Sequence, residues 1–392
     1  MPRMSVRTRG VVLVPLAVML IAACTPPMPP DVLAARAESQ IVCAPGSLEI
    51  GVAETFAGSM SAVGDALTSI CPDQTIVEVA SEQGAPLALV DRTPTPADIT
   101  AFGTANCAAG QTIVVPAFGY PVSMAYNVPG LEGLVMTPEA VAGILSGTVT
   151  SWEDPILAEA NADFDLSALP PISLMSVESP QGSVEAMTTW TSQLAPDAWS
   201  AGTVGTLEAG QKFPSVTDLI GELTIIEGAI AVLPIFQAQN NVLAVANLPV
   251  IVIAEDGTDT EVVVTSDDVQ LYKVGSGATT ITTDDRGNIL ASPAIGGVPI
   301  EGNFDIASSK IVLGEDQAFI GWPVLGYGHL LICDDLAEVL PLSFAQYVVR
   351  LAGQGSLETF GLTPMPEPIR VQTFIPLKVT VSTGDSSATP SS

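Results

Sequence analysis

The sequence predicts an α/β fold in two lobes, and three observations support this prediction. Short apolar runs alternate with helical patterns from residue 48 onward. About 340 residues lie between a Pro- and Ala-rich N-terminal stretch and a polar C-terminal tail, more than one hydrophobic core usually supports. The apolar stretch Thr112–Tyr126 is interrupted by Pro116, Gly119 and Pro121, which suits a strand that passes between lobes through a hinge.

The first expected elements are strands and helices in alternation, each inferred from a short apolar run or from a helical spacing of apolar residues. A helix beginning at Pro138 is favoured because Thr137 can cap it and proline suits the first helical position. In order, the elements are a strand at Leu48–Val52, a helix near Ala57–Ile70, a strand at Thr75–Val79, a helix near Ala85–Val90, the strand Thr112–Tyr126 and a helix at Pro138–Leu145.

The later elements are less regular. A strand at Ile172–Val177 and a helix at Ser183–Leu194 continue the alternation. From Val242 to Val274, β-branched residues and Asp-Gly turns predict strands or a hairpin in the second lobe, and the Gly- and Asp-rich run to Ala307 is expected to be irregular. The last ordered part is expected to be helical at Phe344–Leu351 and Gln354–Phe360, ending at Gly361.

The N-terminus has the layout of an export signal, with three arginines in its first nine residues, the apolar stretch Gly10–Ala23 and then Cys24. The fourteen apolar residues are too few to span a bilayer as a helix. The segment Leu20–Cys24 resembles the bacterial lipobox, whose cysteine is lipidated and becomes the mature N-terminus. We therefore predict a lipid anchor at Cys24 on the extracytoplasmic face of the cell membrane; an ordinary signal peptide that leaves Cys24 as a free thiol is the alternative.

The expected domain organisation follows from these boundaries. A lipoprotein signal peptide covers residues 1–23, the lipid anchor and tether 24–46, the folded domain 47–381 and a disordered tail 382–392. Within the domain, lobe 1 is expected to take about 47–118 and 320–381, and lobe 2 about 119–319.

The charge of the chain restricts its partners. Removing the three leader arginines leaves nine basic residues against 42 acidic ones, so the mature net charge is −33. Nucleic acid and anionic lipid head groups are repelled, which leaves the lipid anchor as the membrane contact. An anionic ligand would have to be held by local backbone N–H groups and hydroxyls against this field.

Four cysteines remain after Cys24, and an even number in an exported chain suggests two disulfides. Three pairings are possible. Cys43 precedes the first strand and Cys71 ends the next helix, so we favour Cys43 with Cys71 and Cys107 with Cys333. The cysteines lack the paired spacing of a zinc site, and neither a metal nor a cofactor is expected.

Six landmarks in this order resemble the phosphate-binding proteins of bacterial phosphate ABC transporters, which have the type II periplasmic-binding-protein fold. The similarity covers most of residues 47–370. The landmarks are Thr55-Phe56, Tyr126–Leu131, Gly143–Gly147, Trp152–Pro155, Gly228–Ile230, and Gly353-Gln354 with Gly361–Pro366. The resemblance implies a cleft between the lobes in which helix N-termini and hydroxyls bind the ligand, since unpaired first-turn N–H groups and the helix dipole attract anions.

The resemblance also implies which residues bind the ligand. Thr55 and Gly182 are the pocket positions that match the family unchanged, and the family's Ser-Asp pair corresponds to Asp91-Arg92. Val177 stands where the family has an arginine, and Glu54 stands where it has a serine, so the pocket is divergent. The candidate ligand-binding residues are Thr55, Gln83, Arg92, Gln181, Gly182 and Ser183.

These observations predict a monomeric solute-binding lipoprotein that delivers phosphate or another small anionic or polar solute to an ABC transporter permease. The alternative is a lipoprotein of the same fold with an altered or lost pocket, acting in sensing or protein interaction. An enzyme is not expected, because His329, the only histidine, lies in an apolar run and no catalytic motif occurs.

Overall fold

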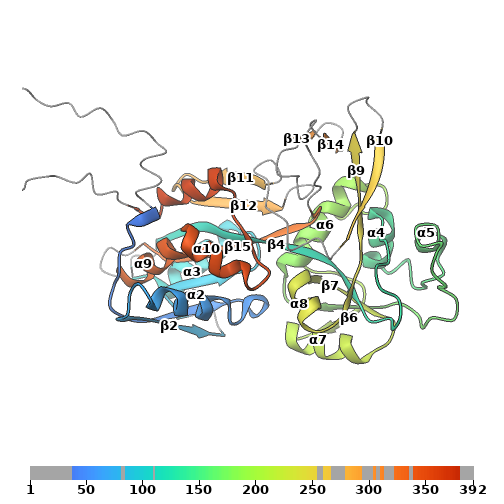
Figure 1. The fold of residues 1–392 in the computed structure, drawn as a ribbon, viewed down its shortest axis with the longest axis horizontal. Coiled ribbons are helices and arrows are strands. Elements are labelled where there is room, and N and C mark those ends of the chain that lie inside the picture. Colours follow the sequence, from blue (N-terminus) through green and yellow to red (C-terminus); the bar gives the residue numbers. More distant parts are fainter. Residues whose placement is uncertain are drawn as a thin grey trace, which may run out of the picture.

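The computed structural model describes residues 38–80, 84–108, 111–253, 259–265, 279–293, 303–305, 310–312, 322–334 and 339–379. Its main feature is a ten-stranded mixed sheet that follows the path β2-β1-β3-β15-β4-β7-β5-β6, with helices packed on it in two lobes (Figure 1). The predicted α/β fold in two lobes is confirmed.

Lobe 1 begins with parallel strands joined by helices. Thr95 caps the second of these helices by accepting a hydrogen bond from the Asp98 N–H, with Pro96 at the first helical position. The elements are β1 (Gly46–Val52), the 3-10 turn η1 (Glu54–Phe56), α2 (Ser59–Thr68), β2 (Gln74–Val79), β3 (Leu87–Val90) and α3 (Pro96–Asn106).

The prediction of a helix near Ala85–Val90 is wrong, because this run forms the central strand β3. Leu87 and Leu89 pack into the main core, whereas Ala88 and Val90 pack on the other face against α3. Both faces of the strand are therefore buried. Such a strand reads as a continuous apolar run, which lacks the alternation that separates strand from helix.

The strand β4 (Thr112–Tyr126) joins the two lobes. Its first part, Thr112–Pro121, pairs with the antiparallel strand β15 (Leu325–Cys333) in lobe 1, and Val122–Tyr126 pairs with β7 in lobe 2. At the crossover, the buried Trp322 indole donates a hydrogen bond to the Val122 carbonyl at 2.7 Å. The predicted strand between lobes is confirmed.

Lobe 2 repeats the alternation of strands and helices. Thr137 accepts a hydrogen bond from the Ala140 N–H and so caps α4, as predicted. The elements are α4 (Pro138–Ser146), α5 (Pro155–Ala158), β5 (Ser173–Val177), α6 (Gly182–Leu194), β6 (Gln211–Phe213), α7 (Val216–Ile225), β7 (Ala229–Pro234) and α8 (Ile235–Asn240).

The β-rich region forms paired strands. β9 (Leu248–Ile253) and β10 (Asp259–Val264) form the expected hairpin, which follows β8 (Ala244–Val245) and is extended by β14 (Lys310–Val312) and β13 (Asn303–Asp305). The expectation of an irregular run before Ala307 is wrong in part, because β11 (Thr279–Thr283) and β12 (Ile289–Pro293) pair as a hairpin. Its β-branched threonines outweigh the nearby Asp-rich turn.

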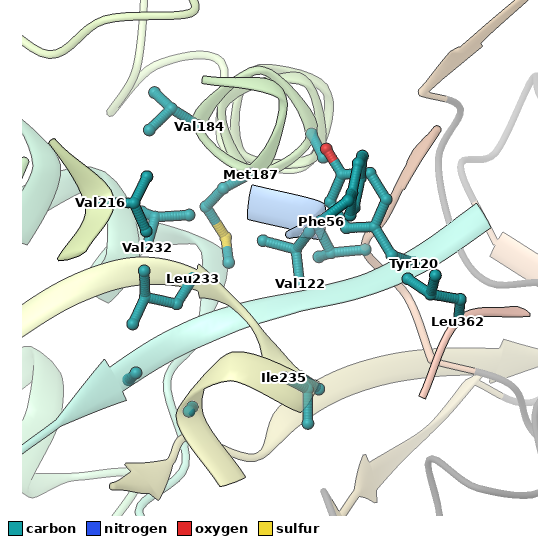
Figure 2. Packing of buried hydrophobic residues seen from close by; sticks show 14 of the residues in the cluster. Phe56, Tyr120, Val122, Val184, Met187, Val216, Val232, Leu233, Ile235 and Leu362 are labelled. Atoms are coloured by element: carbon teal, nitrogen blue, oxygen red, sulfur yellow. The ribbon is translucent and has the colours of Figure 1, made fainter. Parts of the chain in front are cut away.

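The hydrophobic core runs from one lobe to the other (Figure 2). Phe56 and Tyr120 of lobe 1 lie in the same cluster as Met187, Val216 and Leu233 of lobe 2. The side chains between the lobes are therefore packed against one another.

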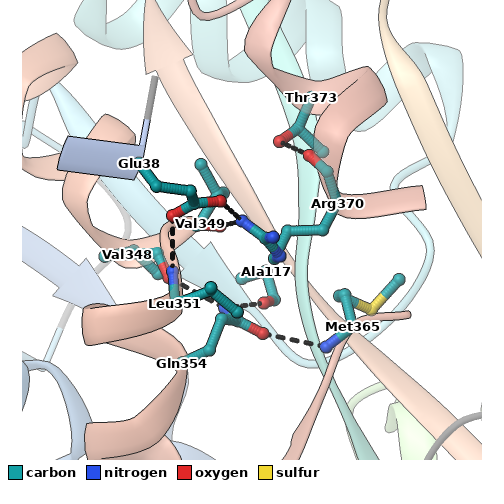
Figure 3. A network of polar contacts seen from close by, with 9 residues as sticks. All are labelled: Glu38, Ala117, Val348, Val349, Leu351, Gln354, Met365, Arg370 and Thr373. Atoms are coloured by element: carbon teal, nitrogen blue, oxygen red, sulfur yellow. Dashed lines mark hydrogen bonds and ion pairs between the residues drawn. The ribbon is translucent and has the colours of Figure 1, made fainter. Parts of the chain in front are cut away.

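The C-terminal helices close lobe 1 around a buried glutamine. The Gln354 amide donates to the carbonyls of Ala117 and Val348 and accepts from the Met365 N–H, each at 2.8 Å (Figure 3). In the same network, Arg370 pairs with Glu38, which fixes the start of the described chain to lobe 1. The elements are α9 (Val339–Val348), α10 (Leu351–Glu358), β16 (Thr363–Pro364), α11 (Glu367–Arg370) and η3 (Val371–Phe374).

Both favoured disulfides are present. Cys43–Cys71 joins the segment before β1 to the end of α2, with the Cα atoms 5.4 Å apart. Cys107–Cys333 joins the end of α3 to the end of β15, with the Cα atoms 5.1 Å apart. Within the part of the chain that the structure describes, none of the helices has the length and apolar character needed to cross a membrane.

Candidate functional site

The predicted binding loops meet between the lobes. Thr55 lies in η1 after β1, Asp91 follows β3, and Gly182 opens α6 after β5. The carboxyl ends of parallel strands collect such loops on one edge of a sheet, where ligands bind in open α/β folds. The predicted residues Thr55 and Gly182 are brought together here.

The group that joins them is the side chain of Asp91. Its Oδ2 accepts a hydrogen bond from the Thr55 hydroxyl at 3.0 Å and from the Gly182 N–H at 3.4 Å. The Tyr120 hydroxyl donates to the Asp91 carbonyl. A Cβ at position 182 would overlap both that carbonyl and the Tyr120 hydroxyl, so this close approach requires glycine. A carboxylate of the chain itself thus occupies the donors of the predicted anion site.

Burial shapes the acidity of this region. Burial raises the pKa of Asp91, and the hydrogen bonds from Thr55 and Gly182 offset only part of that effect. Burial also raises the pKa of Glu185 on α6, whose carboxylate accepts from the Thr93 N–H at 3.4 Å. The centre of the cleft is therefore acidic and poorly solvated.

A second carboxylate crosses the cleft at its rim. Glu54 Oε2 accepts from the Val216 N–H at 2.9 Å, and Oε1 accepts from the Thr217 N–H at 2.9 Å and the Thr217 hydroxyl at 2.5 Å. Burial alone would raise the pKa of Glu54, but the hydrogen bonds from Thr217 and Val216 outweigh it, and the pKa lies below its ordinary value. Glu54 thus caps the first turn of α7 from the opposite lobe.

Aromatic side chains from both lobes pack around Phe56. Phe56 is 1% exposed, and its ring centroid lies 4.9 Å from that of Phe118, 5.1 Å from that of Tyr120 and 6.5 Å from that of Phe236 on α8. The cavity beside Thr55, lined also by Gln181, Ser183 and Gln237, has a volume of about 10 Å³. Such a cavity holds one water molecule at most.

The other candidate residues have different roles in the structure. Arg92 forms a bidentate pair with Asp98, at 2.7 and 3.2 Å. The Gln181 amide donates to the Ser179 hydroxyl of its own loop at 3.1 Å, and the buried Ser183 lines the small cavity. Gln83 lies outside the described residues.

Sequence reasoning missed a cation behind the site. The Lys212 ammonium donates to the Ser176 hydroxyl at 2.9 Å and to the Leu207 carbonyl, and both of these residues line the small cavity. Lys212 is adjacent to β5 only through strand pairing, which no local motif reveals. Among the described residues, no group of three His, Cys, Asp or Glu side chains could hold a metal ion.

The sole histidine is a core residue. His329 is buried on β15, and its Nε2 accepts a hydrogen bond from the Ala291 N–H at 3.0 Å. Burial lowers the pKa of His329 to about 4, which keeps the ring neutral.

Comparison with known proteins places this geometry in context. The family model of the PBP superfamily domain matches residues 43–285. A high-affinity periplasmic phosphate-binding protein, solved with bound phosphate, is 16% identical and has a TM-score of 0.55, over 84% of this chain and 93% of its own. A human phosphate-binding apolipoprotein is 15% identical with a TM-score of 0.53, over 84% of this chain and 94% of its own.

A third solved structure, the ancestral soluble variant of the human phosphate-binding protein, is 16% identical with a TM-score of 0.53, over 84% of this chain and 93% of its own. No curated protein matches the sequence. At these identities, the likeness to solved structures establishes the fold, that of the two-lobed periplasmic binding proteins.

Proposed function

The chain belongs to the PBP superfamily, and we propose that it is an extracytoplasmic solute-binding lipoprotein that delivers phosphate or a related oxyanion to an ABC transporter permease. One observation carries the proposal: the Thr55 hydroxyl and the first N–H of α6 converge on a carboxylate oxygen between the lobes. These donors and the helix dipole suit an oxyanion. Val177 stands where the family has an arginine, and Lys212, which binds Ser176 beside it, supplies a positive charge instead.

The similar solved structures are named as phosphate-binding proteins, which makes a small anion the solute class to test first. We propose that the protein is a monomer held at the outer face of the membrane through lipidated Cys24. Replacing Cys24 with serine should release the protein from the membrane fraction. Retention of the Cys24→Ser variant in membranes would refute the lipid anchor.

Isothermal titration of the purified protein with phosphate, then sulfate and small organic anions, tests solute binding. Thr55→Ala should weaken the binding of whichever anion gives heat in this panel roughly 10- to 100-fold, since a hydrogen bond to a charged group contributes about 1.5–3 kcal/mol. Thr100→Ala is the matched control, because Thr100 is exposed and its hydroxyl bonds only within α3, to Pro96. Equal affinities in the two variants would place the anion elsewhere.

A second function has its own support. Glu54 and Asp91 bind helix N-termini of lobe 2, Phe56 packs against Phe236, and the cavity beside Thr55 holds one water molecule at most. This favours a binding-protein fold whose pocket is altered or lost, used in sensing or protein interaction. Absence of heat across the whole anion panel, with the fold intact, would select this second function.

A further inference from the structure

Two acidic side chains of lobe 1 each bind the N-terminus of a helix in lobe 2. Glu54 binds the first two N–H groups of α7, and Asp91 binds the first N–H of α6. The hydroxyl of Ser215, the N-cap residue of α7, accepts a hydrogen bond from the Asp218 N–H. Glu54 accepts from the two N–H groups before it, so the first turn of α7 has partners for these donors. Both carboxylates therefore satisfy donors that a solute anion would otherwise meet.

Each of the three residues in one turn of lobe 1 contacts lobe 2. In η1, Glu54 binds α7, the Thr55 carbonyl accepts from the Gln237 amide at 3.1 Å, and the Phe56 ring stacks with Phe236 at 6.5 Å and an interplanar angle of 23°. Gln237 and Phe236 both belong to α8 in lobe 2. Three successive residues of lobe 1 thus contact two helices of lobe 2.

We propose that Glu54 and Asp91 are internal ligands that hold the lobes closed in the absence of solute, and that a solute anion binds only by displacing them. This rests on the proposed function, because the donors are those of the proposed anion site. An intramolecular carboxylate has no translational freedom to lose, so it competes at a high effective concentration. The protein then differs from a receptor that is open when empty and closes on its ligand.

Small-angle scattering tests the closure. The scattering curve of the unliganded protein should match the closed structure. The double variant Glu54→Ala/Asp91→Asn should have a larger radius of gyration, because the contacts that it loses lie between lobes. Glu54→Ala alone tests the rim contact with little risk to folding, since Glu54 is exposed.

Glu78→Ala is the matched control. Glu78 is another lobe 1 carboxylate at a helix N-terminus, accepting from the N–H groups of Gly58 and Ser61 at 2.7 Å each, but α2 belongs to the same lobe. Its loss should leave the radius of gyration unchanged. A compact double variant, or unliganded protein that is open and shrinks on adding phosphate, would overturn the proposal.

Calorimetry on the same variants separates this proposal from the proposed function. If the internal ligands compete with phosphate, the double variant should bind phosphate roughly 10- to 100-fold more tightly than the unmodified protein. A double variant that opens but gives no heat with phosphate, sulfate or organic anions supports internal closure and refutes the oxyanion function. Equal phosphate affinity in the open variant and the unmodified protein refutes the competition.

Discussion

Phe56 offers the sharpest measurement of contact between the lobes. Its ring is 1% exposed and contacts Phe118 and Tyr120 in its own lobe and Phe236 in the other. Truncation of a buried phenylalanine costs about 3–5 kcal/mol, the sum of lost transfer free energy and the cavity left behind. We therefore expect Phe56→Ala to lower the free energy of unfolding by about 3–5 kcal/mol, measured by urea denaturation.

A pair of double-mutant cycles divides this loss between the lobes. An aromatic pair contributes about 0.5–1.5 kcal/mol beyond the area it buries. The coupling of Phe56 with Phe118 lies within lobe 1, and that with Phe236 crosses the cleft. If Glu54 helps to close the lobes, Glu54→Ala should reduce the coupling with Phe236 and leave the coupling with Phe118 unchanged.

The result that would refute this reasoning is specific. If Phe56 and Phe236 show no coupling in the otherwise unmodified protein, the lobes are not packed together in solution. Equal loss of both couplings in the Glu54→Ala background would mean that the substitution disturbs lobe 1 itself.

Three further predictions concern stability. Gly182→Ala should loosen lobe closure and destabilise the protein by about 1–3 kcal/mol through overpacking, measured by urea denaturation. Gly221→Ala is the control: no described atom lies within 4 Å of the added Cβ, so it should be neutral or stabilising by up to about 1 kcal/mol. Because the pKa of His329 falls from 6.5 to about 4 on folding, stability should fall as the pH is lowered from 6.5 to about 4, by about 3 kcal/mol in all, and His329→Gln should flatten this part of the pH profile. Serine at both ends of Cys107–Cys333, which closes a separation of 226 residues, should cost about 5 kcal/mol in the chain-entropy description, and a loss below about 1 kcal/mol would contradict it.

The sequence predicted the fold well where elements carry their own local signals. Thr112–Tyr126 forms one strand with those bounds, and Thr137 caps α4 as expected. A similar cap signal also precedes α3, where Thr95 and Asp98 form a capping box with Pro96 at the first helical position, although no helix was predicted there. The prediction at β3 failed because a strand buried on both faces lacks the alternation of apolar and polar residues that marks a strand.

The candidate site was predictable in position but not in occupancy. Thr55 and Gly182 do face each other across the cleft, as their loops indicated. That Asp91 would lie between them depends on how the loop after β3 turns, and this is set by long-range contacts such as the Tyr120 hydroxyl on the Asp91 carbonyl. The pairing of Arg92 with Asp98, six residues along, is likewise decided by the start of α3.

Charge explains why displacement of Asp91 would be coupled to protons. A solute anion that takes the donors of Thr55 and Gly182 leaves the Asp91 carboxylate buried and without those hydrogen bonds. The hydrogen bonds now offset part of the burial that raises the pKa of Asp91, so their loss and the adjacent anion would both raise it further.

Neighbouring charges offset only part of this rise in the pKa of Asp91. Glu185, which faces Asp91 from α6, adds to the negative potential, and burial already raises its own pKa. Arg92 favours the charged form of Asp91, but its guanidinium is bound to Asp98. Anion binding at this site should therefore take up a proton and become tighter as the pH falls. Heats of binding in buffers of different ionisation enthalpy count that proton, and a count of zero would mean that the anion binds without displacing Asp91.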